Sequence, residues 1–144
     1  MARNSVPPSS GTISPAPAAA APSATQGAYA ELIAKARTFE RRGVLSQAHR
    51  AVKDAQRLNP RGAEVFTLQA QLALDEGNAD KAAGLAKRAI LADARSADAY
   101  LVLGTVEQAR AHSAKARAYF KQYLAIAPTG DRAHDVRAVL RMSH

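Results

Sequence analysis

The chain has 144 residues but no cysteine and no long stretch of uncharged apolar residues. Without cysteine there is no disulfide framework and no thiol chemistry, a composition that fits a reducing compartment such as the cytoplasm. A transmembrane helix needs about 20 predominantly apolar residues, so none is expected here. Acidic residues are also fewer than basic ones, 12 against 20, which gives a net charge of +8. These features favour a small, basic, cytoplasmic protein.

Residues that could support catalysis or metal binding are few and scattered. The four histidines are His49, His112, His134 and His144. No two of them have the spacing at which a helix presents a pair of metal ligands, and no glycine-rich phosphate loop follows a strand pattern. Adjacent carboxylates such as Asp75 and Glu76 are explained as a solvated helix face. We therefore expect no enzyme activity, no metal and no cofactor.

The clearest pattern lies between Ala97 and Gly130 and predicts two helices that fold back on each other. Small and apolar residues recur there at helical spacing: Tyr100, Leu103 and Gly104 in the first half, and Ala116, Phe120 and Tyr123 in the second. Pro128 ends the second helix because proline lacks an amide hydrogen. Neither helix could bury its apolar face alone, so the pair is expected to form a hairpin that packs on a neighbour.

The same pattern occurs twice more upstream at one fixed period, because the step from Ala48 to Ala82 equals the step from Ala82 to Ala116. Five columns agree: Ala48, Ala82 and Ala116; Ala55, Ala89 and Tyr123; Ala36, Ala70 and Gly104; Val52, Ala86 and Phe120; Leu32, Phe66 and Tyr100. Short side chains in such columns allow helices to cross closely. Gly43 and Gly77 mark the turn between the helices in the first two copies, where the third copy has Ala111.

This period and these small-residue columns resemble the tetratricopeptide repeat (TPR) family. The resemblance covers Tyr29 to Gly130 and implies an all-α, right-handed superhelical solenoid of antiparallel helix pairs. The repeats are expected at about residues 29–62, 63–96 and 97–130 of a domain spanning residues 28–144. Lys35 and Gln69 stand in the column of Leu103, so the first hairpin, with no repeat before it, is expected to be the least stable.

Segments of different character flank the repeats. Residues 1–27 are rich in Pro, Ala and Ser and carry one charge, at Arg3, which predicts a disordered or extended tail or linker. Residues 131–143 predict a capping helix, with Val136 and Leu140 on its apolar side and charged residues on the other. An alternative is that this helix packs against a partner or a second copy of the chain. The oligomeric state stays open.

The resemblance also implies where a partner would bind. In the TPR family the first helix of each hairpin lines a concave groove, and one stripe of these helices contacts peptide ligands. The corresponding residues here are Ile33, Arg37, Glu40, Thr67, Gln71, Leu74, Leu101, Thr105 and Gln108. Apolar side chains alternate with hydrogen-bonding ones, which suits a peptide or helix anchored by a few hydrophobic residues. We expect a protein-interaction module, a scaffold or an adaptor.

A narrower family role does not fit. TPR domains that clamp the C-terminal carboxylate of chaperones use Lys, Asn and Arg at positions held here by Ile33, Arg37, Leu68, Asp98 and Val102. Only Arg37 is basic, and Asp98 would repel a carboxylate. Binding of chaperone tails is therefore not expected.

The second helices suggest a different function. They are rich in basic residues, and Lys53, Lys87 and Lys121 form a column with the same period as the alanines. Such a stripe could meet nucleic acid or an anionic membrane surface, although no interleaved aromatic residues or groove-reading motif support nucleic-acid binding. A solvated face is the simplest explanation. A type III secretion chaperone is a lesser possibility, since those small three-repeat proteins tend to be acidic whereas this chain has a net charge of +8.

Overall fold

The computed structural model describes residues 23–143. Residues 1–22 of the predicted tail lie outside the described residues, whereas residues 24–27 belong to α2 (Ala24–Arg41), the first helix of the described part. Ser23 and Gln26 form a capping box at its start. The Ser23 hydroxyl accepts a hydrogen bond from the Gln26 amide at 3.1 Å, and the Gln26 side chain accepts one from the Ser23 amide at 3.0 Å. These bonds satisfy amide groups that the helix leaves unpaired, so α2 begins before the predicted domain boundary at residue 28.

Helices form all of the regular structure in residues 23–143. After α2 come α3 (Leu45–Leu58), α4 (Ala63–Asp75), α5 (Ala79–Ala92), α6 (Ala97–Ala109), α7 (Ser113–Ile126) and α8 (Ala133–Met142). The starts of α3, α5 and α7 are separated by the same interval as the alanine columns, and so are the starts of α4 and α6. The sequence period is therefore the period of the helices. None of the helices in this part of the chain has the length and apolar character to cross a bilayer.

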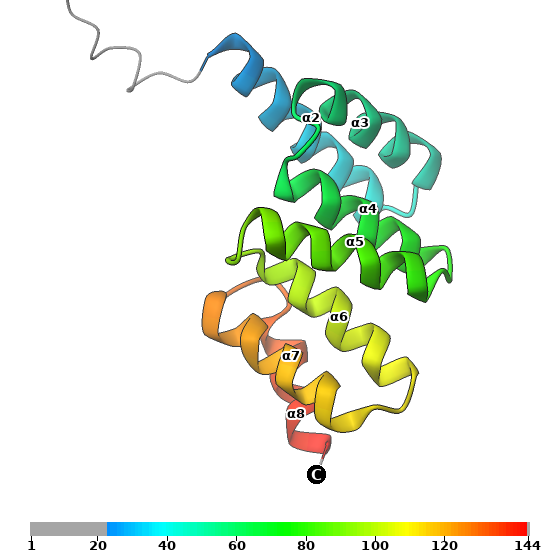
Figure 1. The fold of residues 1–144 in the computed structure, drawn as a ribbon, viewed down its shortest axis with the longest axis vertical. Coiled ribbons are helices and arrows are strands. Elements are labelled where there is room, and N and C mark those ends of the chain that lie inside the picture. Colours follow the sequence, from blue (N-terminus) through cyan, green and yellow to red (C-terminus); the bar gives the residue numbers. More distant parts are fainter. Residues whose placement is uncertain (1–22, 144) are drawn as a thin grey trace, which may run out of the picture.

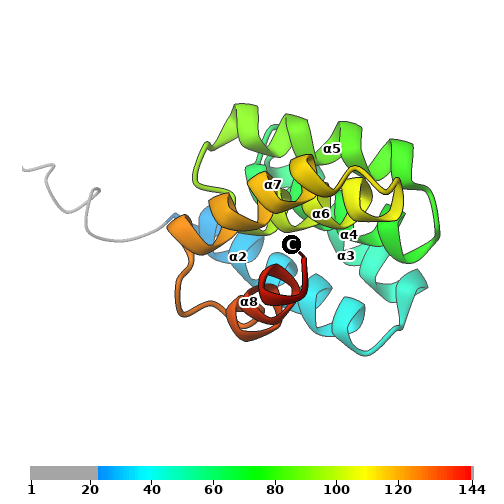
Figure 2. The ribbon, with the colours of Figure 1, turned by 90° about the horizontal axis from the view of Figure 1, so that it is seen from below.

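The helices pair into three antiparallel hairpins, α2 with α3, α4 with α5 and α6 with α7, which stack along the long axis of the molecule (Figure 1). Each second helix packs on the first helix of the next hairpin, and α8 packs on α7 at the end of the stack. Seen along that axis, the hairpins overlie one another and α8 lies away from α5 (Figure 2). The predicted fold class, an all-α solenoid of antiparallel helix pairs, is confirmed.

The small-residue columns lie where the helices cross. Ala48, Ala82 and Ala116 each occupy the fourth position of their helix, and all three are buried. The columns of Ala55, Ala36 and their equivalents are buried as well. The columns therefore mark equivalent packing positions, as the period predicts.

Gly104 in α6 shows why one column needs a residue without a side chain. A Cβ atom at this position would lie 2.5 Å from Cε1 and 2.6 Å from Cδ1 of Phe120 in α7. The preceding hairpins pair Ala36 with Val52 and Ala70 with Ala86 in the same columns. The third hairpin therefore accommodates its larger Phe120 by giving up the side chain opposite.

The turns inside the hairpins share one backbone conformation. Gly43 and Gly77 have φ angles of 73° and 83°, and Ala111 has 63° at the equivalent place. Glycine adopts this left-handed region freely, whereas a residue with a Cβ atom is strained there by about 1–2 kcal/mol. The third hairpin keeps the turn geometry at that cost.

Helix α8 continues the repeat register. Its buried Ala133 and Val136 lie one period after Ala99 and Val102, the α6 residues buried among side chains of α4 and α5. At the positions of Tyr100 and Gly104, where α6 faces its own second helix, α8 has His134 and Ala138, and at the position of the buried Leu103 it has Arg137. Arg137 and His134 are exposed, so this face suits water rather than another helix, as a cap requires.

The opposite end of the stack is polar in the same way. Val65, Leu68 and Leu72 of α4 are buried against the first hairpin. Their equivalents in α2 are Glu31, Ala34 and Thr38, none of them buried. The outer face of α2 therefore lacks the apolar side chains that pack the inner hairpins.

Candidate functional site

Three adjoining hollows follow the side of the solenoid formed by the first helices. The first has a volume of about 70 Å³ and is lined by Arg37, Glu40, Arg41, Gln71, Asp98, Leu101, Asp131 and Arg132. The second, about 120 Å³, shares four of these residues and adds Leu74, Asp75, Val102 and Thr105. The third, about 180 Å³, shares two residues with the first and adds Ala63, Glu64, Thr67, Asp93, Arg95, Ser96 and Ala97. We call the lining residues of these three hollows the inner groove.

The inner groove contains most of the residues predicted to contact a partner. Those that line it are Arg37, Glu40, Thr67, Gln71, Leu74, Leu101 and Thr105. Two of them use their hydroxyl groups inside their own helix, because Thr67 donates to the carbonyl of Ala63 at 2.8 Å and Thr105 to that of Leu101 at 2.9 Å. Their contribution to binding is therefore mainly one of shape.

Two predicted residues lie elsewhere. Ile33 lines none of the three hollows and belongs to the core with Ala36, Val52 and Leu68, so its assignment to the groove is corrected. Its column was chosen by family position, and α4 covers that side of α2. Gln108 lines a separate hollow between α6, α7 and α8, beside Arg117 and Leu140.

The loop before α8 brings residues to the groove that the sequence prediction missed. Asp131 and Arg132 reach it because the buried Tyr123 of α7 holds the loop, its hydroxyl accepting a hydrogen bond from the Arg132 amide at 3.1 Å. Gly130 allows this approach, since a Cβ atom there would lie 2.7 Å from the Tyr123 hydroxyl. The signal in the sequence for this loop was Gly130. It stands directly before the predicted capping helix, one period after Ser96, which precedes α6.

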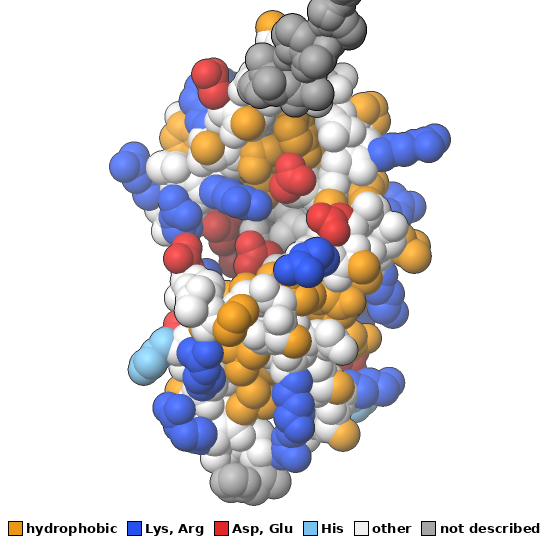
Figure 3. Space-filling view, turned by 90° about the vertical axis from the view of Figure 1, so that its left-hand side faces the viewer, with side chains coloured by type: hydrophobic (Ala, Val, Ile, Leu, Met, Phe, Trp, Pro, Cys, Tyr) orange, Lys and Arg blue, Asp and Glu red, His pale blue; other side chains and the backbone are white. Residues whose placement is uncertain are grey.

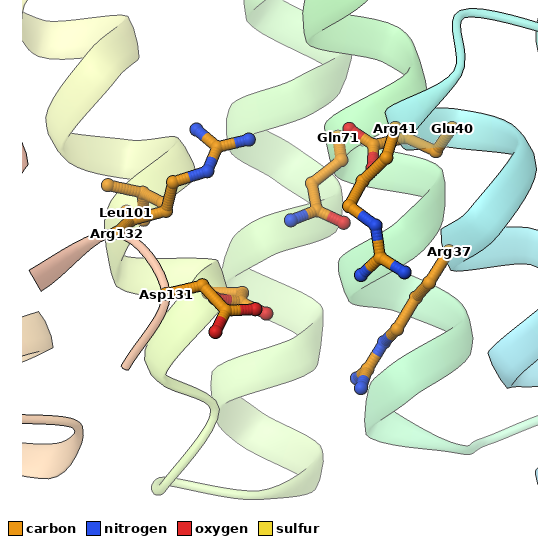
Figure 4. A pocket seen from close by; sticks show the side chains of 8 residues that line it. Arg37, Glu40, Arg41, Gln71, Leu101, Asp131 and Arg132 are labelled. Atoms are coloured by element: carbon orange, nitrogen blue, oxygen red, sulfur yellow. The ribbon is translucent and has the colours of Figure 1, made fainter. Parts of the chain in front are cut away.

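Charged side chains face each other across the hollow. Arg37 and Arg41 extend from α2, Asp131 and Arg132 come from the loop on the opposite side, and Gln71 of α4 lies between them (Figure 4). Figure 3 shows a hollow at mid-height of the molecule where acidic side chains gather with Lys and Arg side chains around them. The groove therefore combines both signs of charge with the apolar walls of Leu74 and Leu101.

Burial perturbs two of these carboxyl groups. It raises the pKa of Glu40 above its ordinary value, and the nearby Asp75 carboxylate raises it further, while Arg132 and Arg41 act in the opposite direction. Burial also raises the pKa of Asp75, against the effect of Arg132. Glu40 is half-buried whereas Asp75 is exposed, so the ionised form is desolvated mainly at Glu40.

The predicted basic stripe is exposed. Lys53, Lys87 and Lys121 lie on α3, α5 and α7, one on each second helix and outside the inner groove. Within residues 23–143 there is no cluster of three His, Cys, Asp or Glu side chains placed to hold a metal ion.

No model of a known protein family matches the chain, and no curated protein matches it in sequence. Solved structures do match the fold. The first TPR domain of Spaghetti (RPAP3), bound to the HSP90 peptide SRMEEVD, has 15% identity and a TM-score of 0.66, with 81% of this chain and 95% of that chain covered.

Two bacterial structures also match. The Yersinia enterocolitica type III secretion translocator chaperone SycD has 12% identity and a TM-score of 0.65, with 88% of each chain covered. A Thermobaculum terrenum O-GlcNAc transferase mutant has 24% identity and a TM-score of 0.71, but the match covers 85% of this chain and only 23% of the transferase. At these identities the likeness concerns the fold. The repeat register, the packed hairpins and these matches together show that the chain has the tetratricopeptide repeat fold.

Proposed function

We propose that this chain is a non-enzymatic protein-interaction module, a scaffold or adaptor that binds a segment of a partner polypeptide in the inner groove. The observation that carries the proposal is the row of adjoining hollows along α2, α4 and α6. Each hollow has room for a side chain rather than for a folded domain. An extended or helical segment could insert successive side chains into such a row of hollows.

The chemistry of the groove supports a peptide ligand. Leu74 and Leu101 are half-buried and offer apolar contact, and Gln71, which lines the same hollow, can supply both a donor and an acceptor to a peptide backbone. The Spaghetti domain, of the same fold, was solved with a peptide bound. A chaperone tail does not fit this groove, because Leu68, at one of the clamp positions, is buried in the core and Asp98, at another, would repel the terminal carboxylate.

Affinity capture from extracts of the source cells tests the proposal. The bait is the full chain, compared with the double variant Leu74→Asn/Leu101→Asn, which makes the groove walls polar without changing charge. Leu91→Asn is the matched control, because Leu91 is 88% exposed and lies outside the groove. We expect a polypeptide retained by wild type and Leu91→Asn and lost with the double variant, whose folding is checked by circular dichroism. Retention by all three baits would refute binding in the groove.

The second candidate is binding of an anionic surface by the basic stripe, favoured by the exposure of Lys53, Lys87 and Lys121. Binding of this kind weakens steeply between about 50 and 200 mM salt. It would also be lost when the three lysines are replaced by Gln, with the groove intact. A captured nucleic acid or lipid vesicle with that behaviour would favour this candidate.

Further roles stay predictions. A secretion chaperone is a lesser alternative, and the likeness to SycD extends to the fold alone. A cytoplasmic location and the absence of catalysis follow from the sequence expectations. The oligomeric state stays open, and light scattering on the full chain would determine it.

A further inference from the structure

The charge of the inner groove is opposite to that of the rest of the chain. Its lining residues include six carboxylates and four arginines, and no lysine. The remaining residues of the chain carry sixteen Lys and Arg against six Asp and Glu. A basic protein thus has a groove with an acidic excess.

None of these carboxylates forms an ion pair within 4 Å in residues 23–143. In residues 23–143 the ion pairs within 4 Å join other groups, such as His49 with Glu76 and Arg57 with Asp54, and none joins two residues of the groove. Asp93 is engaged locally, since its carboxylate accepts a hydrogen bond from the Arg95 amide at 2.9 Å. Glu40 is half-buried and lines the same hollow as the exposed Asp75. The pKa of each is raised because burial, and at Glu40 also the Asp75 carboxylate, outweighs the attraction of Arg132, and neither carboxylate has a base of the described part of the chain within 4 Å.

A cationic side chain of a partner would supply the paired positive charge that Glu40 and Asp75 lack. Glu40 and Asp75 line the second hollow together with Leu74 and Leu101. Lys and Arg combine an apolar stem with a charged head, so the stem can lie on the leucines while the head meets the carboxylates. A purely apolar ligand would bury the carboxylates further without pairing them, at a cost.

We propose that the inner groove selects a partner segment that carries an isolated Lys or Arg next to apolar residues, with the cationic head placed between Glu40 and Asp75. This rests on the proposed function, since it names the class of segment the groove binds. The surface outside the groove disfavours a polybasic tract, because its excess of Lys and Arg repels one. Arg37, Arg41 and Arg132 at the groove would instead favour an acidic segment, so the sign of the selected charge is the decisive result.

Selection from a random peptide display library tests this proposal. The immobilised full chain selects peptides, and those that also bind the Leu74→Asn/Leu101→Asn variant are removed, which eliminates acidic peptides that bind the basic outer surface. We expect the remaining peptides to be enriched in Lys or Arg beside apolar residues. The strongest is then synthesised, and its affinity for the full chain is measured by fluorescence anisotropy.

A charge-neutralising pair of variants completes the test. Glu40→Gln/Asp75→Asn removes the two carboxylates, and we expect it to weaken the selected peptide about tenfold or more. Glu31→Gln/Asp54→Asn removes the same charge outside the groove and is expected to change affinity less than twofold. Groove-dependent peptides that are acidic or uncharged would overturn the charge preference and leave the proposed function standing. If no peptide depends on the two leucines, both proposals fail.

Discussion

Replacing Gly104 by alanine is a test in which helix propensity and packing predict opposite changes in the free energy of unfolding. Replacing a glycine inside a helix by alanine normally stabilises the helix by up to about 1 kcal/mol. At Gly104, however, the new Cβ would lie 2.5 Å from a ring carbon of Phe120. Carbon atoms prefer about 3.5–4.0 Å, so α6 and α7 or the ring must move by about 1 Å. Overpacking of this kind costs about 1–3 kcal/mol, so after the helix-propensity gain we expect Gly104→Ala to lose up to about 2 kcal/mol of unfolding free energy.

Gly84 supplies a matched control within the same chain. It lies inside α5, is exposed, and has no atom within 4 Å of a Cβ built on it. Gly84→Ala is therefore expected to gain about 0.5–1 kcal/mol. Urea unfolding followed by circular dichroism measures both changes. The two substitutions are chemically identical, so a difference in sign isolates the packing term.

Removing the ring should reverse the effect at Gly104. Phe120→Ala alone is expected to lose about 3–5 kcal/mol, but in that background Gly104→Ala no longer meets the ring and should stabilise. That double variant reproduces the alanine pair of the second hairpin, Ala70 and Ala86. If Gly104→Ala gains stability in the wild type as Gly84→Ala does, the close crossing of α6 and α7 is wrong.

Four further predictions concern the turns, the ends and the groove. Ala111→Gly should gain about 0.5–1 kcal/mol in urea unfolding, because Ala111 has a φ of 63°, and no gain would contradict the strained turn. The pKa of the buried Glu107 is lowered chiefly by its hydrogen bond with His112, so the stability that the ionised carboxylate contributes is present above about pH 4.5 and is lost as pH falls through the lowered pKa. Glu107→Gln should therefore flatten the decrease of Tm with falling pH, and an unchanged slope would refute this. Tyr123→Phe should cost about 1 kcal/mol and speed hydrogen exchange at the Arg132 amide, which loses its acceptor, whereas unchanged exchange would show that the loop is held otherwise. Amides in α2 and α3 should exchange faster than those in α6, because α3 packs less extensively on α4 than α5 does on α6; equal protection would count against a weak first hairpin.

Glu107 and Ile33 show how far single columns can mislead. Glu107 stands where the other copies have Phe39 and Ala73, yet it is 8% exposed. Its carboxylate is paired with Arg110 at 3.1 Å and His112 at 2.6 Å, which lets a charge occupy an apolar column. Ile33 was assigned to the groove because Thr67 and Leu101, in the same column, line it, but Ile33 itself packs in the core of the first hairpin. Repeat registers predict which helix position a residue occupies and leave its neighbours undetermined.

The sequence by itself determined the hairpins, their period and their order. These features depend on contacts between helices adjacent in the chain, and the small residues at Ala48, Ala82 and Ala116 record those contacts locally. The polar outer face of α8 was also readable, since His134 and Arg137 stand one period after Tyr100 and Leu103.

The stripe of the first helices was predicted, but only the tertiary structure decided which further charged side chains join it in the groove. Asp75, Asp98 and Arg132 come from two helices and a loop, and no local pattern relates their side chains. Their convergence depends on the rotation of each first helix relative to its neighbours. It also depends on the hydrogen bond from the Arg132 amide to the Tyr123 hydroxyl, which holds the loop before α8. The acidic excess of the groove is hidden in a chain with a net charge of +8, because net charge adds residues that packing separates in space.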